Sequence, residues 1–240
     1  MQPGEHILST FNTALQNLRE TTLIMAAGAQ RNLHNSITGL LQRDKQLCNQ
    51  AIADDDDENQ LEILIDNLSL QIIVRYHPVA TDLRMVIGAM KTATNLERIS
   101  DQAVNIAKRS RKMLKNDEVP EVARIEGLYQ VAAGMLADAV TAYSDSNIDL
   151  ALEVVDRQKE LRKTNKKTSR FFSKKLETET GHYRDYLDLV LTCRWLDRVG
   201  DLATNIAEDV IFESTSTDIR HGGELPPELS EESNPGEESS

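Results

Sequence analysis

Two short stretches of the chain carry the same three polar side chains at a spacing that could bind a cation. In each stretch an acid, a second acid and an asparagine occupy positions i, i+4 and i+8, which places all three on one face of a helix. The residues are Glu97, Asp101 and Asn105 in the first stretch, and Asp197, Asp201 and Asn205 in the second. Carboxylates held together beside apolar residues repel one another and lose hydration, so we expect a positive charge between them.

The two stretches belong to an internal repeat. Residues 96–107 and 196–207 are related by an offset of 100, and seven of their twelve positions are identical. A surface ion-pair network would explain one such stretch. It gives no reason for the acids and the asparagine to keep their register in both copies, so we favour paired cation sites in two similar halves.

A further acid pair strengthens the cation site in the first half. Glu62 and Asp66 are also four residues apart, amid apolar residues on the preceding expected helix. Antiparallel neighbouring helices would let this pair face Glu97 and Asp101. Four carboxylates suit hard, oxygen-seeking cations shared among several metal ions. We therefore expect a multinuclear metal cluster, with iron as the first choice, manganese next, and zinc and magnesium as alternatives.

The second half has no matching acid pair. The residues 99 to 101 positions after Glu62 and Asp66 are Leu161, Arg162, Lys163, Asn165, Lys166 and Lys167, none of them acidic. Asp156 and Glu160, one turn earlier, are weak substitutes. We therefore expect metal mainly in the first half.

Two charged runs have simpler interpretations. Asp54–Glu58 is a run of five acids that we interpret as a solvated surface. Four basic residues at four-residue spacing form a stripe that could meet an acidic partner, phosphate or an anionic lipid, although a solvated face is our preferred interpretation. These four are Arg162, Lys166, Arg170 and Lys174.

Composition narrows the class of protein. The formal net charge of −12 argues against nucleic-acid binding as the main activity. Cys48 and Cys193 lie far apart and predict reduced thiols. We find neither a signal-peptide pattern nor a run long enough to span a membrane. We therefore expect a cytoplasmic protein that reaches membranes only through partners.

The elements that must position the acids are predicted to be long amphipathic helices. Aromatic residues make up only 4% of the chain, and only Pro78 and Pro120 interrupt the body between Pro3 and Pro226. The expected helices cover about 5–41 (one helix, or two joined by a bend near Gly28), 44–77, 82–115, 120–143, 150–175 and 183–212. The fold class is therefore all-α, with two tandem pseudo-symmetric three-helix bundles over residues 1–116 and 117–213. Residues 214–240 are predicted to form a disordered acidic tail.

The repeated motif resembles the twin signatures of the PhoU family. The segments Leu96–Asp101 and Leu196–Asp201 carry this resemblance, and His77–Arg84 is similar to the entry of that family's third helix. The resemblance covers roughly residues 5–213. It implies two three-helix bundles with multinuclear metal sites at the paired acid motifs. It also implies a negative regulator of phosphate uptake that acts with the ATPase of a phosphate ABC transporter and a phosphate-sensing histidine kinase, and we expect a homodimer.

A metalloenzyme is the alternative interpretation. Carboxylate-bridged metals also support oxidases and hydrolases that use metal-activated water. The chain has no glycine-rich phosphate loop, and none of its five histidines stands three residues after a glutamate as in di-iron carboxylate oxidases. We therefore expect a regulatory protein that is not an enzyme.

Overall fold

The computed structural model describes residues 3–217 of the chain, with side chains from Ser9 onward. Helices account for nearly all of this part, which contains no strand. The elements are α1 (Pro3–Leu41), α2 (Lys45–Ala53), α3 (Asp55–Tyr76), α4 (Ala80–Met113), η1 (Pro120–Arg124), α5 (Ile125–Asp145), α6 (Ile148–Thr178), η2 (Thr180–His182) and α7 (Tyr183–Thr215). The predicted all-α class is thus confirmed. The tail was predicted to begin at residue 214, but α7 continues to Thr215, and residues 218–240 lie outside the described part of the chain.

Helix α1 is continuous, so the suggested bend near Gly28 is not present. Gly28 instead lies where the Glu58 carboxyl of α3 packs directly against the helix, leaving no room for a Cβ atom. A glycine inside a helix costs about 1 kcal/mol relative to alanine. The close approach of α3 is the structural reason for the glycine at this position.

The expected second helix is divided into α2 and α3. Asp44 caps α2 by accepting hydrogen bonds from the backbone N–H groups of Gln46 and Leu47. At the break, Asp54 is only 8% exposed and pairs with Arg31 of α1. The interpretation of Asp54–Glu58 as a solvated run was therefore wrong at both of its ends, since Glu58 is only 2% exposed.

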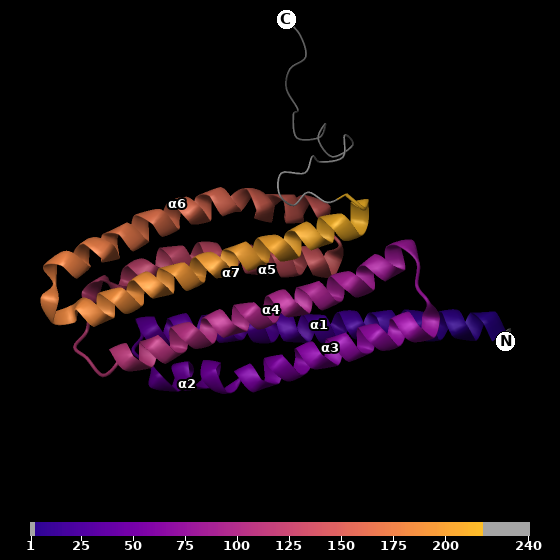
Figure 1. Ribbon diagram of the computed structural model, residues 1–240, viewed down its shortest axis with the longest axis horizontal. Helices are drawn as coiled ribbons and strands as arrows, with labels where there is room; N and C mark the ends of the chain where they lie inside the picture. Colours follow the sequence, from indigo (N-terminus) through magenta and orange to yellow (C-terminus); the bar gives the residue numbers. More distant parts are fainter. Residues whose placement is uncertain (1–2, 218–240) are drawn as a thin grey trace, which may run out of the picture.

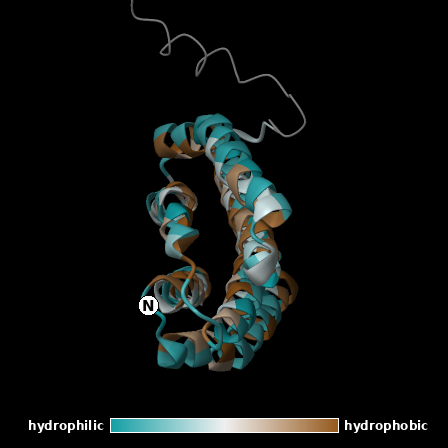
Figure 2. Cartoon of the chain, turned by 90° about the vertical axis from the view of Figure 1, so that its left-hand side faces the viewer, coloured by the Kyte–Doolittle hydropathy of each residue, from teal (hydrophilic) through white to brown (hydrophobic). Residues whose placement is uncertain are grey.

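Each half of the chain forms one bundle, and the two bundles share a long interface. Helices α1, α3 and α4 pack together, as do α5, α6 and α7, while α4 against α7 and α1 against α5 join the bundles. Figure 1 shows α6 along one edge of the molecule, α2 and α3 along the opposite edge, and α4 and α7 between them. Hydrophobic and hydrophilic segments alternate along the helices in Figure 2, as amphipathic packing requires.

Two ion pairs cross the α4–α7 interface. Lys91 Nζ lies 2.9 Å from Asp209 Oδ1, and Arg109 Nη1 lies 3.0 Å from Asp188 Oδ1. One pair joins the start of α4 to the end of α7 and the other joins the opposite ends, so the two helices are antiparallel. Both acids are at least nine-tenths buried, which makes the cost of breaking either pair larger than for a surface pair. No helix in residues 3–217 is long and apolar enough to cross a membrane.

Candidate metal site

The first repeated motif places Glu97 and Asp101 on the edge of α4 that faces α3. Their apolar neighbours Leu96, Ile99 and Ala103 are completely buried, and this burial fixes the orientation of α4 about its own axis. Glu97 itself is partly buried, whereas Asp101 is exposed. The amphipathic pattern of α4 thus holds both carboxylates at the border between the core and solvent.

Three further carboxylates interact electrostatically with Glu97. Burial raises its pKa above the ordinary value, and the negative charges of Asp101, Glu62 and Asp55 raise it further, while Arg98 opposes them. Glu62 therefore lies near Glu97, as the sequence predicted. Mutual repulsion of this kind disfavours the ionised acids unless a cation is present.

Asp55 belongs to this acidic group, although it was not among the residues predicted from the sequence. Burial raises its pKa, and the Asp101 carboxylate adds to the effect, while Lys108 lowers it. Asp55 precedes Glu62 by seven residues, or about two helical turns. That spacing was the signal that could have identified it, but the acids around it suggested a solvated run instead.

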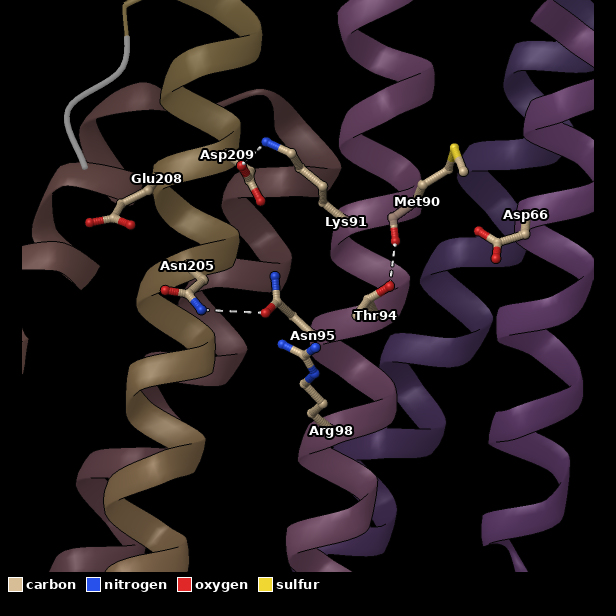
Figure 3. A pocket seen from close by; sticks show the side chains of 9 residues that line it. All are labelled: Asp66, Met90, Lys91, Thr94, Asn95, Arg98, Asn205, Glu208 and Asp209. Carbon is tan, nitrogen blue, oxygen red and sulfur yellow. Dashed lines mark hydrogen bonds and ion pairs between the residues drawn. The ribbon is translucent and has the colours of Figure 1, made fainter. Parts of the chain in front are cut away.

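Asp66 and Asn205 line a groove that runs over α4. Figure 3 shows Asp66 on the α3 side of α4 and Asn205 on the α7 side. Asn205 Nδ2 donates a hydrogen bond to Asn95 Oδ1 at 3.4 Å, and Arg98 of the first motif lines the same groove, which has a volume of about 630 Å³. Asn105, the equivalent of Asn205 in the first motif, is partly buried on α4. Asp66 and Asn205 therefore border one groove with Arg98 of the first motif.

The second motif faces amide and basic groups on α6. Gln158 Nε2 donates to Asp201 Oδ1 at 3.0 Å. Burial and the Asp201 charge raise the pKa of Asp197, while a hydrogen bond from Asn165 and the charge of Arg162 lower it. Arg162 stands 100 residues after Glu62, so a cation replaces a carboxylate at the equivalent position. The sequence prediction that α6 supplies no acids opposite this motif agrees with these contacts.

The donor chemistry of the two halves therefore differs. In residues 9–217, no three histidine, cysteine, aspartate or glutamate side chains converge closely enough to hold a metal ion as they stand. The first half nevertheless offers four neighbouring carboxylates whose repulsion a hard cation would relieve. In the second half Arg162, Asn165 and Gln158 already supply positive charge and hydrogen bonds. The donor set of the first group therefore suits a hard cation better than that of the second, although Asp197 Oδ1 is also buried without a hydrogen-bond partner.

The fold and the duplicated motif define a class of all-helical proteins made of two similar bundles with an acidic motif in each. The PhoU domain profile matches residues 22–110 and 125–210, one match in each bundle. The chain belongs to the PhoU family.

Individual relatives agree with this assignment. A phosphate-specific transport system accessory protein PhoU homolog from Pseudomonas putida is 31% identical over 91% of this chain and 86% of its own length. The PhoU accessory protein of Escherichia coli K12 is 27% identical over 92% of this chain and 91% of its own. The crystal structure of PhoU from Pseudomonas aeruginosa superposes with a TM-score of 0.83 at 29% identity, covering 86% of this chain and all of that one. The phosphate transport system regulatory protein PhoU from Streptococcus pneumoniae shares the fold with a TM-score of 0.79.

Proposed function

We propose that this protein is a negative regulator of phosphate uptake and of phosphate-starvation signalling that acts by binding other proteins. The observation that carries the proposal is the PhoU domain match in both bundles, together with relatives named as accessory proteins of phosphate-specific transport systems. The proposed partners are the ATPase of a phosphate ABC transporter and a phosphate-sensing histidine kinase. In this proposal the chain needs no nucleophile or nucleotide site of its own, because the proposed partners would supply that chemistry.

We further propose that metal binds in the first half, with iron as the first choice and manganese, zinc or magnesium as alternatives. The proposed ligands are Glu97, Asp101, Glu62 and Asp55. The raised pKa values of Glu97 and Asp55 support the proposal, because they indicate that a nearby positive charge would stabilise the ionised acids. The metal would neutralise the carboxylates and join α3 to α4. Metal removal should then loosen the first bundle and weaken partner binding together.

The regulator is proposed to act as a homodimer that pairs through α3. Ile63, Leu70 and Val74 lie on one face of this helix at i, i+7 and i+11, and they are 61%, 52% and 71% exposed. Asp57 and Arg75 are 18 residues apart, about five full turns, so both flank the same side of this apolar stripe. If two α3 helices pair antiparallel about a twofold axis, Asp57 of each copy meets Arg75 of the other. This charge complementarity favours a second copy as the partner of α3.

The function is tested by complementing a deletion strain at high external phosphate. Wild-type protein should restore low phosphate uptake and low expression of phosphate-responsive phosphatase. Glu97→Gln/Asp101→Asn should restore them only in part, provided circular dichroism shows that the variant is still folded. Glu153→Gln, an exposed acid on α6, is the matched control and should behave as wild type. If deletion leaves uptake and phosphatase expression unchanged, the regulatory proposal is wrong and the carboxylate-bridged metalloenzyme becomes the better hypothesis.

A further inference from the structure

A second candidate ligand site lies between α6 and the start of the second bundle. Arg124 of η1 and Lys167, Arg170 and Lys174 of α6 line one open groove with a volume of about 670 Å³. Among the lining residues, Glu126 is the one acid. We refer to these four cations and the space between them as the basic groove. It includes Arg170 and Lys174 of the basic stripe that the sequence suggested, but not Arg162 or Lys166, and Lys167 is an additional member.

The basic groove carries charge that the protein does not neutralise. Some cations of α6 have acidic partners: Lys175 lies 2.8 Å from Glu121, and Arg157 pairs with Asp138. Within residues 9–217, none of the four groove cations forms an ion pair. All four cations are exposed, so water and salt screen part of their mutual repulsion, and an anion bound in the groove would reduce the remainder.

Aromatic packing holds part of the groove in place before any ligand binds. The Arg124 guanidinium lies 4.0 Å from the centre of the Phe171 ring, a cation–π contact. Phe171 packs edge-on against Phe172, which is completely buried, with the ring centres 5.6 Å apart. Because Arg124 is supported in this way, binding an anion would cost less side-chain entropy than at a free surface arginine.

We propose that the basic groove binds a small polyanion that carries two or more linked phosphate groups. Four cations from two elements surround a volume in the range of small-ligand sites, which is typically about 300–1,000 Å³. A single orthophosphate could contact only part of this set. A chain of phosphates could contact Arg124 on one side and the lysines of α6 on the other, with bidentate hydrogen bonds from the arginines. The inference is independent of the proposed regulatory role and of the metal site.

The test uses titration calorimetry on the full-length protein with tripolyphosphate in metal-free buffer, where chelation of cations cannot imitate binding. Tripolyphosphate should bind saturably, and orthophosphate and sulfate at least about tenfold more weakly. Lys167→Gln/Lys174→Gln should weaken tripolyphosphate binding by about tenfold or more. Lys163→Gln/Lys166→Gln removes the same charge from the same helix outside the groove, and should change binding by less than about twofold.

Three outcomes would overturn the proposal. One is the absence of saturable tripolyphosphate binding, and another is equal weakening by both double variants, which would indicate a general charge effect. The third concerns lipid headgroups as the source of the phosphates. If vesicles of phosphatidylglycerol and phosphatidylcholine bind through Lys167 and Lys174 and tripolyphosphate does not compete, the groove is a membrane surface site and not a site for a soluble polyanion.

Discussion

Glu213 is a partly buried acid at the junction of the two bundles, and its Oε1 atom is shielded from water. Its carboxyl packs against Gly88 of α4, and Oε1 has no hydrogen-bond partner. Burial raises the pKa of Glu213 to about 8, and Asp209 adds to the rise, while Arg19 and Lys91 oppose it. The folded protein therefore holds this proton far more tightly than the unfolded chain, whose glutamates titrate near 4.5.

The raised pKa of Glu213 predicts that stability falls with rising pH. Its contribution is fully present below about pH 4.5 and is lost as the pH rises through about 8, because unfolding releases the proton across that window. Glu213→Gln keeps the shape of the protonated acid and should raise the free energy of unfolding at pH 8.5 by at least about 1 kcal/mol, with little change at pH 5. Urea unfolding at both pH values measures this. Glu153→Gln is the control, and a Glu213→Gln variant with no pH-dependent gain would contradict the prediction.

The two repeated motifs should differ in metal content. Glu97→Gln/Asp101→Asn removes two of four neighbouring carboxylates and should abolish most metal binding after loading with Fe²⁺ or Mn²⁺. Asp197→Asn/Asp201→Asn should remove much less, because Arg162 and Asn165 already interact with Asp197. Metal per chain, measured by inductively coupled plasma mass spectrometry on folded protein, checks the difference. Equal losses in the two variants would show that the asymmetry argument is wrong.

At the scale of elements, the corner between α1 and α2 depends on a close backbone approach. A Cβ atom at Gly39 would lie 2.6 Å from Cys48 Sγ, 2.9 Å from the Asp44 carbonyl oxygen and 3.1 Å from the Cys48 backbone nitrogen. Two of these three atoms are backbone, so rotating a side chain cannot relieve the overlap. The corner in turn sets where α2 packs on α4.

Gly39→Ala should therefore destabilise the protein by about 1–3 kcal/mol, the usual cost of an overpacked site. Gly127 of α5 is the matched control, because a Cβ there would meet nothing within 4 Å. Gly127→Ala should be neutral or stabilise by about 0.5 kcal/mol through a smaller loss of backbone entropy. Thermal unfolding of the two variants beside wild type measures both effects. Similar melting temperatures for Gly39→Ala and wild type would mean that α2 can move away from α1.

At the scale of the whole molecule, the proposed homodimer places the exposed apolar stripe of α3 at its centre. Leu70→Asp/Val74→Asp should convert a dimer of twice the chain mass into a monomer, because each change buries a charge in an apolar contact. Leu187→Asp changes an exposed leucine of α7, 45% exposed, and should leave the mass unchanged. Multi-angle light scattering after size-exclusion chromatography measures the mass.

A charge swap tests the antiparallel geometry of the same dimer. Arg75→Asp should weaken the dimer by placing like charges together, and Arg75→Asp combined with Asp57→Arg should restore it. Restoration is expected only if these two side chains meet across the twofold axis. If the double variant stays monomeric while Leu70→Asp/Val74→Asp also dissociates the dimer, α3 is the interface but the helices are not antiparallel.

The fold class and the acid motifs could be predicted from the sequence because both are local, periodic properties of the chain. Apolar residues at helical spacing predict amphipathic helices, Pro78 and Pro120 end or begin them, and the offset of 100 residues predicts two similar bundles. The same spacing predicted that Glu62 lies near Glu97 and that a basic residue, Arg162, replaces the acid in the second half.

The environments of individual charges were decided only by tertiary packing. The sequence does not determine the axial register of α3 against α4. In the structure this register brings Asp55 near Asp101 and places Asp66 in the groove of Figure 3. Likewise Glu58 and Glu213 look like surface acids in the sequence, yet each packs against a glycine of another helix. The physical reason is that periodicity determines which face of a helix is apolar, whereas burial of a charge depends on contacts between residues distant in the chain.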